Sequence, residues 1–300
     1  MEFLPEETVR SLLTYEDLIP AVERALVDLS AGKIQQPVRG ILWVPQHNGV
    51  FAQMPAVDGE LMGVKLVTFY ESNRTLPTHQ ATIQLFSATT GEPLVAMDGR
   101  LITEMRTAAV SAVATRCLAR DDARALAILG SGVQARSHLE ALRRVRSFQQ
   151  IRVWSRSPEN ARRFADEFRL ATMPSAEAAV RGADVVVSVT ATHDPLVRGA
   201  WLADQALVCA VGAVGPHKRE LDDAALAADI VVESREAAGK ESGDLIGAGA
   251  TVTAELGEVL AGAALPGRGR WTIFKSLGVA AEDLAAAKIV WYRWRKKWDG

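Results

Sequence analysis

A glycine-rich turn between an apolar run and a helical segment constrains the fold of this chain more than any other feature. The run Ala125–Leu129 leads into Gly130-Ser-Gly-Val-Gln-Ala135. In a strand–turn–helix of this kind, Gly130 permits a tight turn, Gly132 lets a pyrophosphate approach the backbone, and Ala135 keeps helix and strand close. The helix start also offers free N–H groups and the positive end of its dipole. The segment predicts a dinucleotide site, whose expected contact residues are Gly130, Gly132, Val133 and Gln134.

The end of the following strand indicates which dinucleotide is bound. A carboxylate about 20 residues after the glycines would accept hydrogen bonds from the adenosine ribose of NAD. This chain has Ser155-Arg156-Ser157 there instead. A guanidinium between two hydroxyls attracts a 2′-phosphate, and nothing in the triplet repels one. We therefore expect Ser155, Arg156 and Ser157 to bind NADPH, with NADH as the second choice.

Composition and charge exclude several classes of protein. The chain has 300 residues, of which 48% are hydrophobic, so it can bury a core; this length suggests about two domains. A net charge of −2 gives no electrostatic argument for binding nucleic acid or an anionic membrane. Neither a secretory signal nor an apolar stretch long enough to span a bilayer is visible. We expect a cytoplasmic protein without a metal site, in which Cys117 and Cys209 are buried free thiols.

The first third of the chain predicts a helix followed by a meander of antiparallel strands. Apolar residues first recur at helical spacing, and short alternating runs then flank the turn dipeptides Asp58-Gly59 and Thr90-Gly91. The expected elements are a helix over 16–29, strands over 50–57, 61–70, 81–86 and 93–97, and a helix over 104–118 that Thr103 caps.

The remainder alternates between strands and helices, a pattern typical of a doubly wound α/β sheet that is buried on both faces. Strands are expected over 125–129, 152–155, 184–189, 206–211 and 229–232, and helices are expected to begin near Pro158, Ser175, Asp222 and Ala280. The fold class is therefore α/β, with a Rossmann-type sheet and a discontinuous α+β domain.

Short sequence blocks spread over almost the whole chain resemble those of the ornithine cyclodeaminase/mu-crystallin family, and most closely its mu-crystallin branch. These blocks are Gln36–Arg39, Lys65–Glu71, Thr78–Ala81, Met97–Gly99, Arg106–Ala112, Gly130–Ala135, Arg219–Leu221, Lys240–Asp244, Ala254–Glu258 and Phe274–Gly278. The resemblance implies a homodimer of two-domain subunits. Residues 1–118, completed by a C-terminal helix over 279–300, would bind substrate and dimerise, and residues 119–278 would form the NADP-binding Rossmann domain.

The resemblance also implies hydride transfer at a carbon that bears nitrogen and lies next to a carboxylate. Arg39, Lys65 and Arg106 match the family positions that hold the substrate carboxylate and face the reacting centre. A guanidinium can grip such an anion with two parallel hydrogen bonds. Lys65 lies on a predicted strand, where burial near other cations would lower its pKa and suit it to donate a proton. Arg106 and Thr107 follow the expected cap, so they could instead bind cofactor phosphate, and the sequence does not decide between these roles.

Other matched segments line the cofactor or the cleft in this family. The additional residues expected at the cofactor are Thr78, His79, Thr107, Thr190, Val211 and Ser276. The residues expected to line the substrate pocket are Met54, Phe69, Tyr70, Val214, His217 and Lys218. One departure matters: ornithine cyclodeaminases carry an aspartate where this chain has Val214, and valine can neither engage an amine nor move a proton. Ornithine cyclisation with ammonia release is therefore disfavoured.

The sequence thus favours an NADPH-dependent reductase of the C=N bond of cyclic ketimines, such as piperideine- or pyrroline-2-carboxylate. A small imine carboxylate would be the substrate and a second copy of the chain the partner. One alternative is an amino-acid dehydrogenase, or an N-alkylating reductive aminase, that acts on 2-oxo acids. Another is a protein that binds a thyroid-hormone-like ligand and retains NADPH, a role that the resemblance to the mu-crystallin branch implies.

Overall fold

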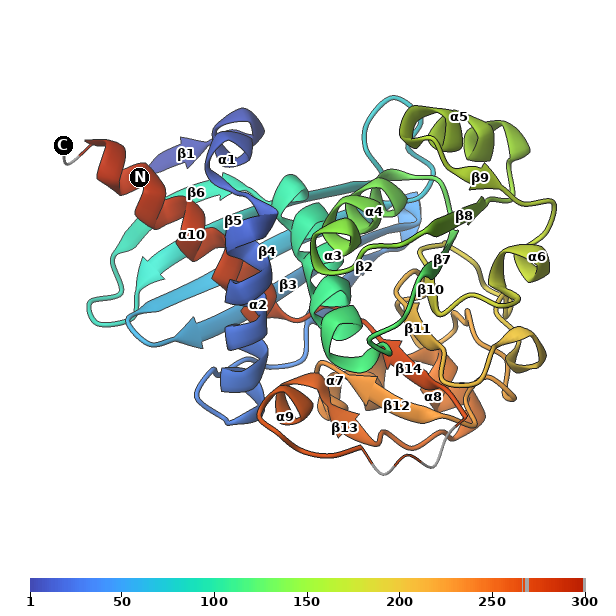
Figure 1. Cartoon of the computed structure of the whole chain (residues 1–300). Coiled ribbons are helices and arrows are strands. Elements are labelled where there is room, and N and C mark those ends of the chain that lie inside the picture. The colour runs from blue at the N-terminus through green and yellow to red at the C-terminus, as the bar shows by residue number, and fades with distance from the viewer. Residues whose placement is uncertain (266, 268–269, 299–300) are drawn as a thin grey trace. The chain divides into compact units, whose positions relative to one another are not determined.

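The computed structural model describes residues 1–265, 267 and 270–298, which form two compact units (Figure 1). One unit is Met1–Arg106 with Gly278–Gly300, and the other is Thr107–Leu277. The division falls within helix α3 (Arg100–Leu118), whereas the expected boundary follows that helix. Within the described ranges, no helix is both long and apolar enough to cross a membrane.

The first unit contains a six-stranded sheet with the order β1-β6-β5-β4-β3-β2. Its strands are β1 (Glu2–Leu4), β2 (Gly40–Val44), β3 (Gly49–Asp58), β4 (Leu61–Tyr70), β5 (His79–Ser87) and β6 (Pro93–Asp98). All neighbours are antiparallel except β1 and β6, so the predicted meander is confirmed and extended by a short strand at each edge. Gly59 has a φ of 61°. A tight hairpin turn needs a residue with positive φ, and glycine adopts such a φ readily.

Helices from both ends of the chain belong to this first unit. They are α1 (Glu6–Leu12), α2 (Tyr15–Ser30) and α10 (Ala280–Trp298), and the short 3₁₀ turn η1 (Pro45–His47) joins β2 to β3. Helix α10 packs against α2 and against strands β3 and β4. The apolar stripe expected over 16–29 is the buried face of α2, on which Leu18, Val22 and Leu26 are all 0% exposed. The C-terminal helix therefore completes the core of a unit built mainly from the first third of the chain.

Helix α3 begins earlier than expected, which corrects the assignment of Thr103 as its cap. Asp98 Oδ1 accepts hydrogen bonds from the backbone N–H groups of Arg100 and Leu101 at 3.0 and 3.2 Å. The hydroxyl of Thr103 instead donates to the carbonyl of Gly99 at 2.7 Å. Arg106 therefore lies beyond the first turn, and the helix N–H groups do not surround it.

The second unit contains an eight-stranded sheet with the order β13-β12-β14-β11-β10-β7-β8-β9, in which every neighbouring pair is parallel. Its strands are β7 (Ala125–Leu129), β8 (Gln150–Trp154), β9 (Ala171–Thr172), β10 (Val185–Ser188), β11 (Leu207–Ala210), β12 (Asp229–Val232), β13 (Ala254–Glu255) and β14 (Thr272–Lys275). Strands β10, β11 and β12 are buried along their whole length, as a sheet covered on both faces requires. The Rossmann-type α/β fold is confirmed.

The helices of this unit are α3 from Thr107 onward, α4 (Val133–Val145), α5 (Pro158–Phe168), α6 (Ala176–Val180), α7 (Arg235–Glu241), α8 (Gly243–Ala248) and α9 (Leu256–Leu260), with the 3₁₀ turn η2 (Gly199–Trp201). The helix expected near Asp222 is wrong. Asp222 Oδ1 accepts from the N–H groups of Gly199 and Ala225, so a single turn is tied to a distant segment instead of propagating. The expected burial of Cys117 is also wrong: both cysteines are free, but only Cys209 is buried.

Candidate active site

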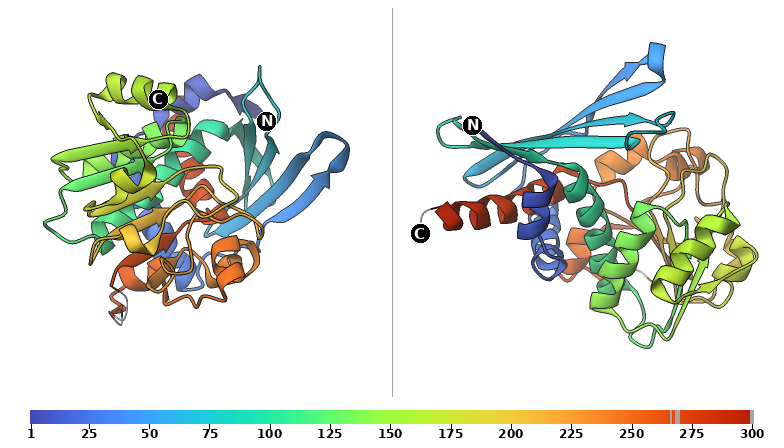
Figure 2. Two further views of the ribbon diagram at one scale, coloured as in Figure 1. Left: turned by 90° about the vertical axis from the view of Figure 1, so that its right-hand side faces the viewer. Right: turned by 90° about the horizontal axis from the view of Figure 1, so that it is seen from above.

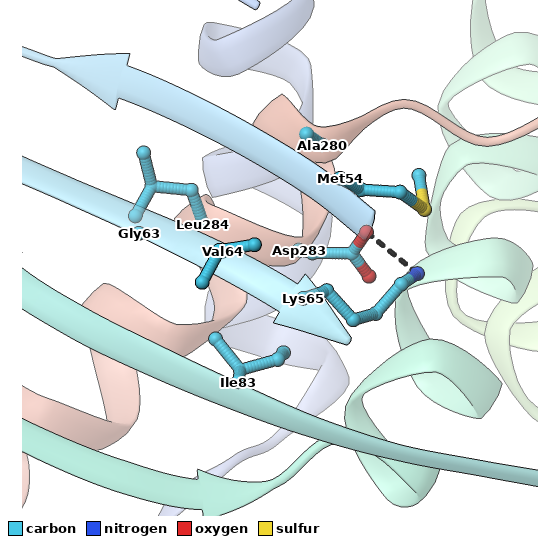
Figure 3. A pocket seen from close by; sticks show the side chains of 8 residues that line it. All are labelled: Met54, Gly63, Val64, Lys65, Ile83, Ala280, Asp283 and Leu284. Carbon is cyan, nitrogen blue, oxygen red and sulfur yellow. Dashed lines mark ion pairs between the residues drawn. The ribbon is translucent and has the colours of Figure 1, made fainter. Parts of the chain in front are cut away.

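Lys65 lies in a buried charge cluster within the first unit. It is in the middle of β4, where Met54 on β3 and Ile83 on β5 are its direct cross-strand neighbours. The side chain is 2% exposed, and its Nζ lies 2.7 Å from Oδ2 of Asp283 on α10 (Figure 3). Met54, Ile83 and Leu284 are among the residues that line a pocket with this ion pair. The cation predicted from the sequence therefore has an apolar surround and a carboxylate partner.

Arg106 joins the same cluster from α3. Its Nη1 donates to Glu282 Oε2 at 2.8 Å, and its Nε donates to Asp283 Oδ1 at 3.2 Å. The guanidinium packs against Gly278, where a Cβ would lie 2.0 Å from Nη1. Gly278 also has a φ of 73°, so both the space and the backbone at this position call for glycine.

Arg39 completes the cluster from the segment before β2. Its Nη2 donates to the backbone carbonyl of Gly278 at 2.7 Å, and its charge acts on both Lys65 and Asp283. Three cationic side chains, those of Lys65, Arg106 and Arg39, thus lie around the carboxylates of Glu282 and Asp283. A group of cations of this kind suits the binding of a small anion.

Burial and neighbouring charges shift the protonation equilibria of this cluster. Burial, together with Arg106, lowers the pKa of Lys65 to about 7, although Asp283 opposes the shift. Burial alone would raise the pKa of Asp283, but Lys65 and Arg106 outweigh it and hold that pKa below its ordinary value. Burial and then Lys65 lower the pKa of His79 to about 4, so its ring is neutral at neutral pH. Lys65 is therefore the group in this cluster that can exchange a proton near pH 7.

The glycine turn in the second unit has the geometry expected of a dinucleotide site. Gly130 has a φ of 124°, and a Cβ there would approach the carbonyl of Val189 to 3.0 Å. Gly132 is the N-cap of α4, has no side-chain cap and has no atom within 4 Å of where a Cβ would lie. The first turn of α4 therefore begins without a side-chain cap at the carboxyl end of β7, with space beside Gly132 and with Val133 51% exposed. A pyrophosphate fits this turn.

Gln134 and the triplet after β8 supply polar groups beside this turn. Gln134 Oε1 is buried and has no hydrogen-bond partner among the described residues, so it can accept from a ligand hydroxyl. Arg156 is exposed and forms no ion pair with any described residue. Its two neighbours are engaged within the protein: Ser155 accepts from the Ser131 hydroxyl at 3.0 Å, and Ser157 caps α5 by accepting from the N–H of Asn160. Within the triplet, the guanidinium of Arg156 is thus the group that can contact a ligand without first breaking one of these hydrogen bonds.

The chain belongs to the ornithine cyclodeaminase/mu-crystallin family. The model of that family matches residues 2–298. Ketimine reductase mu-crystallin from Mus musculus is 45% identical over 303 residues, which cover 97% of each chain. The structure of Thermococcus litoralis Δ1-pyrroline-2-carboxylate reductase with NADH and L-proline has a TM-score of 0.93 at 35% identity, covering 99% of this chain and 98% of that one. An archaeal alanine dehydrogenase dimer with bound NAD has a TM-score of 0.93 at 33% identity, covering 98% and 96%. Both of these solved relatives therefore bind a pyridine nucleotide, NADH in the first and NAD in the second.

The remaining family-matched residues of the first unit divide between the two faces of its sheet. Phe69 and His79 are direct cross-strand partners and lie on the same face as Lys65, because Phe69 is four residues along the same strand. Tyr70 lies on the opposite face, over Gly49, where a Cβ would meet its ring at 2.3 Å. The expectation that Tyr70 walls the pocket is therefore wrong. Thr78 is exposed just before β5.

In the second unit, several family-matched residues gather at the carboxyl ends of the parallel strands. They are Thr190 after β10, Val211 and Val214 after β11, and Ser276 after β14, whose hydroxyl donates to Glu233 at 2.6 Å. His217 is exposed and Lys218 partly exposed in the loop that follows, while Thr107 is 8% exposed on α3. Carboxyl ends of strands are where open α/β sheets bind their ligands. Thr190, Val211 and Ser276, which are expected at the cofactor, lie at this edge, and so does Val214, which is expected at the substrate pocket.

Sequence reasoning missed the acidic half of the charge cluster. Glu282 and Asp283 lie in the first turn of α10, where acidic residues are usual because they complement the helix dipole. The available signal was two adjacent carboxylates within an otherwise apolar segment, Gly278–Ala287, in which a solvated face is not expected. Glu220 and Lys275 were missed for a different reason, because each lies in a matched block that gives it no role of its own.

Proposed function

We propose that this chain is an NADPH-dependent reductase of cyclic imines that bear a carboxylate next to the C=N carbon. The observation that carries the proposal is the buried cluster of Lys65, Arg106 and Arg39 with Asp283 and Glu282. It combines three cationic side chains, which attract a carboxylate, with an ammonium group whose pKa is lowered to about 7 by burial. Imine reduction needs both features, because the substrate is an anion and its nitrogen gains a proton.

Each cation has a distinct role in this proposal. Arg39 and Arg106 hold the substrate carboxylate, with Arg106 kept in place by Glu282 and Asp283. Lys65 supplies the proton to the imine nitrogen, and a nicotinamide, when bound, would supply hydride to the adjacent carbon. The arriving carboxylate raises the pKa of Lys65, because a nearby negative charge favours the ammonium form. Substrate binding therefore increases the fraction of Lys65 that is protonated and able to donate.

The preference for NADPH over NADH rests on Arg156. It is exposed at the carboxyl end of β8 and is not neutralised by a described carboxylate. A 2′-phosphate would form charge-assisted hydrogen bonds with its guanidinium. We assign the phosphates to Gly130, Gly132 and the first turn of α4, and the nicotinamide half to the residues after β10, β11 and β14. The first unit would then bind substrate and the second the cofactor.

We also propose that the protein is a homodimer that forms through the first unit. Strand β2 is at the edge of the six-stranded sheet, and both views of Figure 2 show β2 and β3 extending there as a long hairpin. Ile41, Leu42 and Trp43 on β2 are 44%, 64% and 72% exposed. Successive strand residues point to opposite faces, so both faces of this edge strand present apolar side chains. A second copy would cover them.

The proposal is tested by following NADPH absorbance with a panel of substrates. We expect turnover with piperideine-2-carboxylate or pyrroline-2-carboxylate, giving pipecolate or proline. Ornithine should release no ammonia, because Val214 cannot engage the substrate amine. Faster turnover with pyruvate and ammonia, or pyruvate and methylamine, would instead establish an amino-acid dehydrogenase or a reductive aminase. NADPH binding without turnover of any imine would contradict the proposal and favour a ligand-binding protein.

A further inference from the structure

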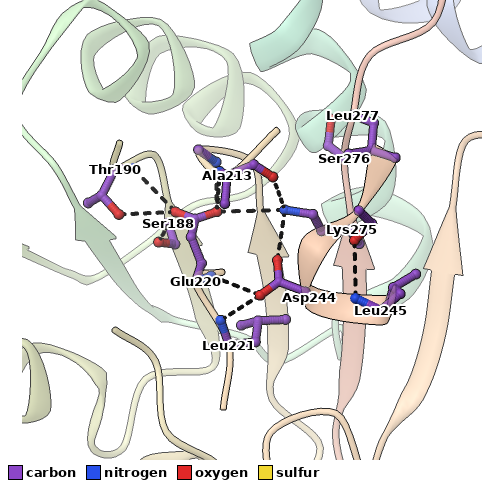
Figure 4. Close-up of polar contacts among 12 residues, drawn as sticks. Ser188, Thr190, Ala213, Glu220, Leu221, Asp244, Leu245, Lys275, Ser276 and Leu277 are labelled. Carbon is purple, nitrogen blue, oxygen red and sulfur yellow. Dashed lines mark hydrogen bonds and ion pairs between the residues drawn. The ribbon is translucent and has the colours of Figure 1, made fainter. Parts of the chain in front are cut away.

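Glu220 joins two loops at the carboxyl edge of the parallel sheet. Its side chain is 0% exposed. Figure 4 shows its carboxylate directed toward Ser188, Thr190 and Ala213. Oε1 accepts from the Ser188 hydroxyl at 2.5 Å and from the N–H and hydroxyl of Thr190 at 3.3 and 3.1 Å. Oε2 accepts from the N–H groups of Gly212 and Ala213 at 2.7 and 3.0 Å. One carboxylate thereby holds the segment after β10 to the segment after β11.

A second layer of buried charge holds Glu220 and these loops in place. Lys275, at the end of β14, donates to the carbonyl of Ala213 at 2.8 Å and pairs with Asp244 at 3.0 Å. Asp244 Oδ1 accepts from the N–H groups of Glu220 and Leu221 at 2.8 and 2.9 Å. Glu220, Asp244 and Lys275 are all 0% exposed. Burying charges is costly unless each is paired and hydrogen-bonded, so this network fixes the backbone of the loops closely.

The loops that Glu220 joins lie at the switch point of the sheet. After β7 the chain proceeds to β8 on one side, and later returns to β10 on the other side of β7. Gly130, which follows β7, packs against Val189, which follows β10. Gly212 packs so closely on Thr190 that a Cβ would lie 2.1 Å from its carbonyl oxygen. In a doubly wound sheet the dinucleotide crosses this crevice, with one mononucleotide on each half.

We propose that Glu220 is a positioning residue for the nicotinamide half of the cofactor. This inference rests on the proposed function in one respect, namely that a pyridine nucleotide binds at the carboxyl edge of this sheet. The adenosine half lies on the β7–β8 side, where Glu220 makes no contact. Glu220 touches neither cofactor nor substrate, and it acts by holding Thr190, Gly212 and Ala213 at the separation that the nicotinamide ribose and ring require.

The experiment compares two ligands on a matched pair of variants. Glu220→Gln keeps the shape of the side chain but turns one acceptor into a donor. Asp184→Asn makes the equivalent change at the opposite end of β10, where Asp184 also accepts from two backbone N–H groups, those of Arg124 and Ala125. Calorimetric titration with NADPH and with adenosine 2′,5′-bisphosphate then separates the whole cofactor from its adenosine half.

We expect Glu220→Gln to weaken NADPH about tenfold, as loss of buried charge-assisted hydrogen bonds does, and to lower kcat. Its affinity for adenosine 2′,5′-bisphosphate and its KM for the imine should match the parent within about twofold. Asp184→Asn should leave the ratio of the two affinities unchanged. Ser188→Ala, which removes one donor to Glu220, should show the same selective loss at smaller size and serves if Glu220→Gln does not fold.

Equal weakening of both ligands would mean that Glu220 only supports the fold, and it would overturn the inference. Parental affinity for NADPH in folded Glu220→Gln, or in Ser188→Ala if only that variant folds, would do the same. A parent protein that binds adenosine 2′,5′-bisphosphate but not NADPH would contradict the proposed function together with this inference. The parental titration therefore distinguishes the two failures.

Discussion

Lys65 and Asp283 form an ion pair of 2.7 Å, although one lies on a strand in the first quarter of the chain and the other on its last helix. Both side chains are almost completely buried, at 2% and 3% exposure. Asp283 keeps the ammonium form of Lys65 accessible, because burial without a carboxylate partner would lower the pKa of Lys65 further. The C-terminal helix therefore sets the protonation of a residue that the proposed reaction needs as an acid.

The first prediction concerns the pH dependence of kcat/KM, which reports the free enzyme. Lys65 donates a proton only while protonated, so kcat/KM should fall as the pH rises through about 7. Asp283→Asn removes a charge that raises this pKa, so the alkaline limb should move to lower pH. Glu282→Gln is the matched control, because Glu282 pairs with Arg106 and should move the limb less. Ionisation of the substrate affects kcat/KM of every variant equally, so it cancels when kcat/KM of a variant is divided by that of the parent at the same pH. Superimposable profiles for the parent and Asp283→Asn would contradict the assignment.

A second prediction separates the roles of Arg39 and Lys65. Arg39 holds the carboxylate in both the ground and transition states, so Arg39→Ala should chiefly raise KM, by roughly tenfold or more. Lys65→Ala should chiefly lower kcat, by about 10²–10⁴-fold, which is typical of a lost general acid. Steady-state kinetics with saturating NADPH measures both. NADPH binding, followed by fluorescence, should persist in each variant, since neither residue is among those that we assign to the cofactor. A near-normal kcat for Lys65→Ala would make Lys65 a binding residue only.

The parts that sequence predicts well are those specified by neighbouring residues. The glycine turn, the buried parallel strands and the Asp58-Gly59 hairpin each depend on local hydrophobic spacing and turn chemistry, and all are present. The early start of α3 is also locally encoded, because Asp98 accepts from the first N–H groups of the helix, whereas we expected Thr103 to be the cap.

The parts that sequence does not predict depend on contacts between distant segments. Asp222 resembles a helix cap and does accept from the N–H of Ala225, yet the same oxygen also accepts from distant Gly199, and the single turn does not continue as a helix. Likewise, Asp283 gains its importance only when α10 packs against β4 and brings its carboxylate to Lys65. Local pattern identifies each residue type, whereas the pairing that shifts its pKa follows from the tertiary fold.

A third prediction tests the basis of cofactor choice. The parent should prefer NADPH to NADH in kcat/KM. Arg156→Ala should weaken NADPH by roughly 1.5–3 kcal/mol, the value of a lost hydrogen bond to a charged group, and leave NADH nearly unchanged. Arg162→Ala, on the helix that follows, is a suitable control because Arg162 is also exposed. Equal use of both dinucleotides by the parent would contradict the role of Arg156.

The last prediction concerns assembly through β2. A new lysine on an edge strand disfavours pairing with another chain, since its charge would have to be buried. Ile41→Lys should therefore convert the expected dimer into a monomer, as measured by light scattering at micromolar concentration. Ile246→Lys is a matched control: Ile246 is 45% exposed and Ile41 is 44% exposed, but Ile246 lies on α8 in the other unit. The control should stay dimeric. A monomeric parent, or an Ile41→Lys variant that remains dimeric, would rule out an interface centred on this strand.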